Sequence, residues 1–94
     1  MRFEWDPNTS TANRRKHGIS FDEAQSVFFD DTATLYDDPD HSANEVRFLL
    51  LGLSVTLRVV VVAHCVREGG EVIRVISARR STRAETEAYG GGHP

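Results

Sequence analysis

The first quarter of the chain alternates between an extended and a helical pattern. Residues 2–5 alternate polar and apolar side chains, which predicts a short strand. The dipeptide Asp6-Pro7 then favours a helix start, and Gly18 favours a stop, so we expect a helix over residues 7–17. Its only apolar residue is Ala12, which predicts a surface helix with one thin contact stripe.

A second, more apolar helix is predicted directly after this stop. Ser20 and Glu23 have the spacing of a capping box. Apolar side chains then recur at helical spacing, namely Phe21, Ala24, Val27 and Phe28. This pattern is typical of a helix that buries one face against a sheet.

The rest of the chain is dominated by strand patterns. Apolar and β-branched segments cover residues 32–36, 45–53, 58–67 and 71–78. The segment 45–53 is nearly continuous in apolar residues, which favours a central strand covered on both faces. A capping box at Thr82 and Glu85 predicts a short final helix, and we expect the glycine-rich residues 90–94 to be disordered. The chain is then a single domain over residues 1–89.

The order of these elements predicts the fold class. Strands grouped together, rather than alternating with helices, indicate an α+β fold. We expect a small, mainly antiparallel sheet packed against two N-terminal helices, with a short C-terminal helix.

Composition and charge narrow the function classes. The chain has 94 residues, one cysteine and no apolar run near the ~20 residues of a membrane span, so we expect a cytoplasmic protein without a membrane partner. A net charge of −3 argues against a bulk nucleic-acid binder. However, eight acidic and no basic residues lie between positions 22 and 45, whereas positions 67–83 hold five arginines and two glutamates. Arginine is the side chain suited to bidentate phosphate contacts, so the second segment could bind phosphate.

The main candidate site lies in this arginine-rich hairpin. It contains His64, Arg67, Arg74, Ser77 and Arg79. Metal-independent RNA cleavage needs a base for the 2′-hydroxyl, an acid for the leaving oxygen and positive charge on the transition state, which histidine and arginine supply. The competing interpretation is a buried, hydrogen-bonded histidine with arginines paired to glutamates.

The register of the hairpin is open at this point. A two-residue turn at Gly69-Gly70 places His64 opposite Val75, whereas a bulged turn places it opposite Arg74.

Three further groups are candidates. Cations end the first helix, where they either complement its dipole or bind RNA phosphates: Arg14, Arg15, Lys16 and His17. Glu45 and Arg47 share a strand face. Either they form an ion pair with a neighbouring strand, which is favoured, or Glu45 is a proton-transfer partner or an orienter of an arginine. An acidic group either forms a simple turn or holds a divalent ion, and the turn is favoured: Asp37, Asp38, Asp40 and His41.

Several segments together resemble one known family. They are Phe3-Glu4-Trp5-Asp6-Pro7-Asn8, residues 13–24 around Lys16-His17-Gly18, Asp37-Asp38-Pro39-Asp40-His41, Glu45-Val46-Arg47 and residues 72–80 around Ile73-Arg74-Val75-Ile76-Ser77-Ala78-Arg79. The chain is similar to the BrnT family of bacterial type II toxin–antitoxin toxins nearly throughout residues 1–89. It departs from that family in its acidic net charge and at Cys65-Val66.

The resemblance implies a RelE-like fold and a ribonuclease that needs no cofactor or metal and inhibits translation. It implies a BrnA-type antitoxin, which alone contacts operator DNA, and RNA as the substrate. The resemblance implies that eight positions are functional: Lys16, His17, Glu45, Arg47, His64, Arg67, Arg74 and Arg79. We expect the catalytic residues to be His64, Arg74, Arg79, Lys16 and Glu45, and the RNA-binding residues to be Arg14, Arg15, His17, Arg47 and Arg67. The alternative function is a non-catalytic binding module that engages an antitoxin or another acidic partner.

Overall fold

A computed structural model describes residues 1–39 and 45–91. In chain order the elements are β1 (Arg2–Glu4), α1 (Pro7–His17), α2 (Phe21–Ser26), η1 (Val27–Phe29), β2 (Thr34–Asp37), β3 (Arg47–Leu53), β4 (Val59–Arg67), η2 (Glu68–Gly70), β5 (Val72–Arg80) and α3 (Arg83–Gly91). The predicted α+β class is confirmed.

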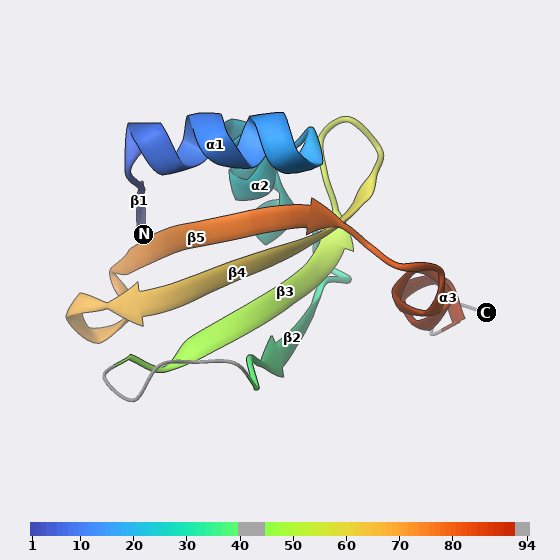
Figure 1. Cartoon of the computed structure of the whole chain (residues 1–94). Helices are drawn as coiled ribbons and strands as arrows, with labels where there is room; N and C mark the ends of the chain where they lie inside the picture. Colours follow the sequence, from blue (N-terminus) through green and yellow to red (C-terminus); the bar gives the residue numbers. More distant parts are fainter. Residues whose placement is uncertain (40–44, 92–94) are drawn as a thin grey trace.

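The five strands form one mixed sheet in the order β1-β5-β4-β3-β2 (Figure 1). Neighbouring strands are antiparallel except β1 and β5, which pair in parallel. Residues 47–53 form β3, an interior strand between β4 and β2, although the middle strand of the five is β4. The long apolar run suits β3 because both of its faces are covered in part: Leu50 lies in the core, and Leu49 and Leu51 line a hollow that α3 also lines.

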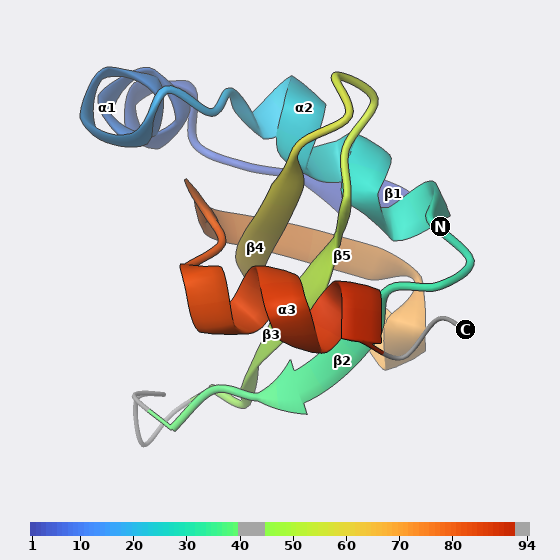
Figure 2. The ribbon, with the colours of Figure 1, turned by 90° about the vertical axis from the view of Figure 1, so that its right-hand side faces the viewer.

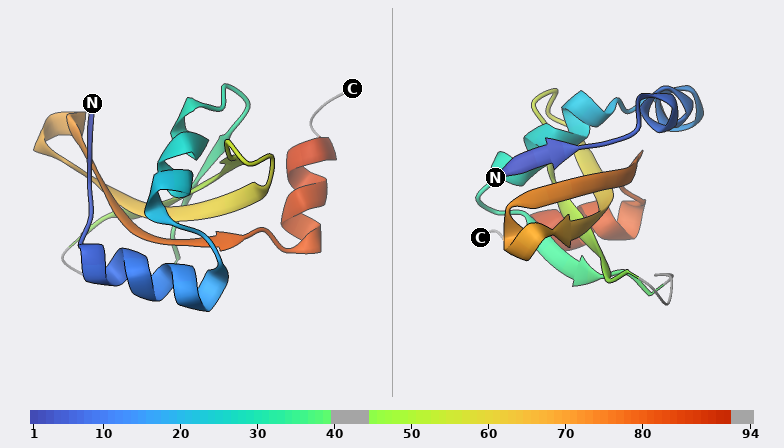
Figure 3. Two further views of the ribbon diagram at one scale, coloured as in Figure 1. Left: turned by 90° about the horizontal axis from the view of Figure 1, so that it is seen from above. Right: turned by 90° about the vertical axis from the view of Figure 1, so that its left-hand side faces the viewer.

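The helices lie at different places around this sheet. The two views of Figure 3 place α1 along the outer edge of β5, whereas α2 and η1 lie against one face of the sheet. Figure 1 shows α3 past the C-terminal end of β5, and in the view of Figure 2 it crosses in front of β3 and β4. The expectation that both N-terminal helices cover one sheet face therefore holds for α2 but not for α1.

Local signals set the helix ends as predicted. The Asp6 side chain caps α1 by accepting a hydrogen bond from the backbone N–H of Asn8, and Gly18 ends the helix in the left-handed conformation, with φ +73°. Ser20 caps α2 through the N–H of Glu23. The contact stripe of α1 is different from the one expected, because Ala12 is exposed and Asn13 is the buried residue.

The hydrophobic core lies between α2 with η1 and one face of the sheet, called here the core face. It is formed by Ile19, Phe21, Ala24, Val27, Leu50, Val60, Val62, Val75 and Ala78. Trp5 closes one side by an edge-to-face contact with Phe21. The other face of the sheet is called here the open face.

The β4–β5 register settles the two hairpin alternatives. Val66 pairs with Ile73 and His64 with Val75, as a two-residue turn requires. Farther along, the pairing shifts between Ala63 and His64, and Ile76 is the extra residue on β5. This bulge changes which β5 side chains share a face.

The last helix follows its predicted cap. The Thr82 hydroxyl accepts from the N–H of Glu85, and the Glu85 carboxylate accepts from the N–H of Thr82. The helix continues to Gly91, two residues into the segment expected to be disordered, and residues 92–94 lie outside the described range. Among the described helices, none has the length and apolar character to cross a membrane.

Candidate functional site

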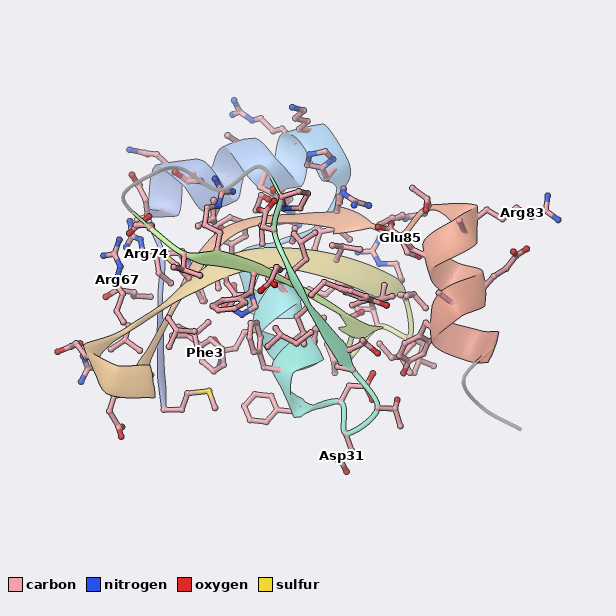
Figure 4. All side chains as sticks on the ribbon, turned by 90° about the horizontal axis from the view of Figure 1, so that it is seen from below. Phe3, Asp31, Arg67, Arg74, Arg83 and Glu85 are labelled. Atoms are coloured by element: carbon pink, nitrogen blue, oxygen red, sulfur yellow. The ribbon has the colours of Figure 1, made fainter. Side chains whose placement is uncertain are left out.

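The strand register places four polar side chains in one row across the sheet. Glu4 of β1 is level with Arg74 of β5, which pairs with Cys65 of β4, which pairs with Arg47 of β3. Because paired residues point to the same side of a sheet, all four lie on the open face. Arg67 and Glu45 complete the group, and Figure 4 shows Arg67 and Arg74 together at this end of the sheet.

We refer to Glu4, Glu45, Arg47, Arg67 and Arg74 as the arginine–carboxylate cluster. Arg67 contacts two carboxylates: its Nη1 lies 3.4 Å from Glu4 Oε1 and its Nη2 lies 2.5 Å from Glu45 Oε1. Arg74 Nη1 lies 3.6 Å from the same Glu4 oxygen. The side chains of Arg67 and Arg74 are 45% and 33% exposed, so an anion in solution can reach both guanidinium groups.

Glu45 is held tightly inside this cluster. The hydrogen bond from Arg67 lowers the pKa of the Glu45 carboxyl, with smaller effects of the Cys65 thiol and Arg47. Burial raises the pKa of the Cys65 thiol, and the neighbouring Glu45 charge acts in the same direction. The thiol is therefore a neutral group beneath the cluster and not an activated nucleophile.

Arg47 is the most enclosed arginine of the cluster. Its Nε lies 3.6 Å from Asp38 Oδ2, and Asp38 is buried. Within the described residues this Nε is buried without a hydrogen-bond partner. The predicted pairing of Arg47 with a neighbouring element is therefore present, and it is made with Asp38 rather than with Glu45.

The β5 bulge brings a fourth arginine, Arg79, to the same face as Arg47, Arg67 and Arg74. Arg74 and Arg79 are five positions apart and would point to opposite faces of a regular strand. With Ile76 as the extra residue, Arg74, Ser77 and Arg79 pair with β4 residues of the same face. Bulges commonly redirect side chains in this way near functional sites.

Arg79 forms an ion pair with a carboxylate of the C-terminal helix α3. Its Nη1 and Nη2 donate to the two Glu85 carboxylate oxygens at 2.7 and 3.0 Å, and this pair lowers the pKa of Glu85 to about 2. Beside it, an apolar hollow of about 380 Å³ separates α3 from the sheet. Its lining residues are Tyr36, Leu49, Leu51, Val61, Ala84, Glu85 and Ala88.

His64 lies on the core face, away from the cluster. Its side chain packs edge-to-face against Phe28, with ring centroids 4.8 Å apart, and Nδ1 lies 3.2 Å from the carbonyl oxygen of Val62. The residue is 2% exposed, and burial lowers the pKa of its imidazole. The prediction that the histidine and arginines form one surface is wrong, and the competing interpretation, a buried and hydrogen-bonded histidine, is confirmed.

The cations of α1 form a separate group. Arg14, Arg15 and Lys16 are exposed on the last turn, and in the described parts of the chain they form no ion pair. His17 is partly buried on the same turn. These residues are not members of the arginine–carboxylate cluster, although α1 contacts β5 along its length.

The acidic turn has no described metal site. Asp37 is exposed, Asp38 is buried beside Arg47, and Asp40 and His41 lie outside the described residues. Across residues 1–39 and 45–91, no group of three or more histidine, cysteine, aspartate or glutamate side chains is arranged to hold a metal ion.

Sequence reasoning missed one member of the cluster. Glu4 lies on the short strand β1 and contacts two arginines more than sixty positions away. The only local signal was its alternation with Phe3, which placed it on the opposite face from the core. Its partners follow only from the parallel pairing of β1 with β5.

Fold and site together define a small α+β protein with a group of arginines and carboxylates on one face of its sheet. A family model described as "Ribonuclease toxin, BrnT, of type II toxin-antitoxin system" matches residues 5–85. The chain therefore belongs to the BrnT family of ribonuclease toxins, and membership of a type II system implies an antitoxin partner.

A solved structure agrees with this assignment at the level of the fold. The crystal structure of the Brucella abortus ribonuclease toxin BrnT, at 1.1 Å resolution, aligns with a TM-score of 0.65 and 24% sequence identity. The alignment covers 88% of this chain and 99% of the Brucella chain. A comparison with curated proteins finds no match.

Proposed function

We propose that residues 1–89 form a metal-independent endoribonuclease that cleaves cytoplasmic RNA and thereby inhibits translation. The observation that supports this most directly is the arginine–carboxylate cluster, in which guanidinium groups from β3, β4 and β5 meet on the open face of the sheet. RNA cleavage by attack of the 2′-hydroxyl produces extra negative charge on the phosphate, and positioned guanidinium groups stabilise that charge.

In this proposal the phosphate binds between Arg67 and Arg74. Both side chains are accessible and converge on one point, the carboxylate oxygen of Glu4. Attack of the 2′-oxygen on phosphorus yields a 2′,3′-cyclic phosphate and a free 5′-hydroxyl. Arg79 adds positive charge to the same face once its pair with Glu85 opens.

The remaining predicted residues take supporting roles. Glu45 orients Arg67, since it is bound to that guanidinium and its pKa is lowered. Arg47, fixed by Asp38, contributes charge from β3. Arg14, Arg15, Lys16 and His17 add backbone affinity that should weaken as salt increases, while buried His64 has a packing role.

We further propose that the antitoxin is of the BrnA type and that, within the toxin–antitoxin pair, only the antitoxin contacts operator DNA. We also propose that the toxin fold belongs to the RelE-like group. The apolar hollow between α3 and the sheet supports a protein contact near the open face.

A second candidate function has its own support. Each of Arg67, Arg74, Arg79 and Arg47 already has a carboxylate partner in the structure, as expected for arginines that only stabilise the fold. The chain would then be a non-catalytic module that engages an acidic partner such as an antitoxin.

Arg74→Ala separates the two functions. We expect purified wild-type protein to cleave total bacterial RNA in EDTA, and Arg74→Ala to cleave it about 10²–10³-fold more slowly, the usual effect of removing one group that stabilises transition-state charge. Arg83→Ala is the matched control, because Arg83 is a 93%-exposed arginine of α3 outside the cluster.

The possible results of this experiment distinguish the ribonuclease from the non-catalytic binding module. Equal loss in Arg74→Ala and Arg83→Ala would contradict a specific role for the cluster. No cleavage by the wild type, on free RNA or on RNA in translating ribosomes, would favour the binding module.

A further inference from the structure

We propose that Glu4 is the group that accepts the proton of the attacking 2′-hydroxyl. This inference rests on the proposed ribonuclease function and deepens it, because the arginine–carboxylate cluster otherwise lacks an assigned base.

The position of Glu4 marks where a phosphate oxygen can bind. A single carboxylate oxygen, Oε1, lies 3.4 Å from Arg67 Nη1 and 3.6 Å from Arg74 Nη1, two guanidinium groups from adjacent strands. Carboxylate and phosphate oxygens are recognised by arginine in the same way. A phosphate bound by these two arginines therefore lies directly beside the Glu4 carboxylate.

The Glu4 carboxylate is also loosely held. Both of its contacts are long for charge-assisted hydrogen bonds, and within the described residues its second oxygen, Oε2, accepts no hydrogen bond. Its side chain is 41% exposed, so it can shift to make room for the phosphate without leaving the site.

The other groups near the cluster are poorer proton acceptors. Glu45 is fixed to Arg67 at 2.5 Å, and its lowered pKa makes it a weaker base. The Cys65 thiol is buried and neutral, and His64 lies on the opposite face of the sheet. Asp38 is buried beside Arg47.

The chemical step balances with Glu4 in this role. The carboxylate takes the proton from the 2′-hydroxyl as the 2′-oxygen forms its bond to phosphorus. The bond between phosphorus and the 5′-oxygen breaks, and the leaving oxygen takes a proton from water. Arg67 and Arg74 remain charged and neutralise the non-bridging oxygens throughout.

Glu4→Gln tests this role because the amide keeps the size of the side chain and cannot accept the proton. We expect kcat to fall about 10²-fold or more. Affinity for an RNA of the same sequence with 2′-O-methyl groups, which cannot be cleaved, should stay equal or increase, because a negative charge beside the phosphate is removed. Glu4→Asp should retain more activity than Glu4→Gln, since it keeps a carboxylate on a shorter arm.

Glu71→Gln is the matched control, because Glu71 is a 76%-exposed glutamate just before β5 and outside the cluster. The inference is overturned if Glu4→Gln keeps a kcat within about threefold of wild type, or if its affinity for the methylated RNA falls in proportion to its activity. Cleavage that is lost in Arg74→Ala but kept in Glu4→Gln overturns the role of Glu4 alone. A wild-type protein that cleaves no RNA overturns the proposed function and this inference together.

Discussion

At the scale of single residues, the imidazole of His64 shows how strongly a sheet face decides what a side chain does. It lies between the rings of Phe28 and Phe48, with centroids 4.8 and 5.9 Å away, and it is almost fully buried. Burial disfavours the charged form, which is why its pKa is lowered from 6.5. The ring is therefore a neutral part of the core at pH 7.

The lowered pKa predicts a stability that depends on pH near neutrality. The unfolded chain binds the histidine proton more readily than the folded protein, so the free energy of unfolding should fall as pH drops below about 6.5. Urea unfolding of wild type and His64→Phe at pH 7.5 and 5.5 measures this. We expect the phenylalanine variant to lose less stability between the two pH values, and an equal loss in both proteins would contradict the assignment.

The chemical types in the site could be read from the sequence, but their arrangement could not. The hairpin arginines were recognised because charged side chains are rare among valines and isoleucines. Whether Arg74 and Arg79 share a face depends on the bulge at Ile76, which is a property of strand pairing and leaves no local signal. The same holds for Glu4, whose partners come from strands that follow it by more than sixty residues.

At the scale of secondary-structure elements, one side chain joins α1 to the sheet. The Asn13 amide nitrogen donates to the carbonyl oxygens of Ile19 and Ala78, and its amide oxygen accepts from the backbone N–H of Ala78. Strand β1 pairs with β5 only as far as Arg74. Beyond that point the Asn13 amide makes the backbone hydrogen bonds to β5 that a neighbouring strand would otherwise make. It thereby satisfies and protects an otherwise open sheet edge.

This arrangement predicts a large effect of Asn13→Ala. The variant leaves the buried N–H and carbonyl of Ala78 without their partners, and each such group costs about 1–3 kcal/mol. We expect the free energy of unfolding to fall by about 2–4 kcal/mol in urea titrations. Asn8→Ala is the control on the same helix, because Asn8 is exposed. Similar stabilities of the two variants would show that the edge contact is unimportant.

Helix boundaries were predictable because caps are local. Asp6, Gly18, Ser20 and Thr82 each bond within three or four residues along the chain, so spacing alone identifies them. The placement of α1 was not predictable, because a polar helix offers no apolar stripe and its contact is made by one asparagine. The capping box predicted at Ser20 forms only in part. The Glu23 carboxylate points away from the start of the helix and accepts hydrogen bonds from the β3–β4 connection instead.

At the scale of the whole molecule, three carboxylates connect different elements of the fold. Glu23 of α2 accepts hydrogen bonds from Ser54, Thr56 and Arg58, and the Arg58 interaction contributes most to a pKa of about 2. Glu85 joins α3 to Arg79 of β5 and also has a pKa of about 2.

Asp30 is the third of these carboxylates. It accepts from the N–H of Leu53 in β3 and from the hydroxyl of Tyr89 in α3. Burial raises its pKa, but these hydrogen bonds outweigh burial and lower it to about 2. Glu23, Asp30 and Glu85 thus hold α2, the β3–β4 connection and α3 to the sheet, and all three do so in the ionised form.

Because the folded pKa of each carboxylate lies below its unfolded value, their stabilisation is present above about pH 4.5 and is lost as pH falls toward 2. Glu23 is the most enclosed, with a side chain 8% exposed, and its lowered pKa corresponds to about 3 kcal/mol. Glu23→Gln should therefore be less stable than wild type at pH 7 and lose less stability between pH 5 and 2.5. Glu87→Gln, on the exposed side of α3, should follow the wild-type curve in urea titrations across this range.

If Glu23→Gln instead lost as much stability in acid as wild type, the acid sensitivity would have to come from Asp30 and Glu85. The attachment of α3 to the sheet, rather than that of α2, would then limit the stability of the fold.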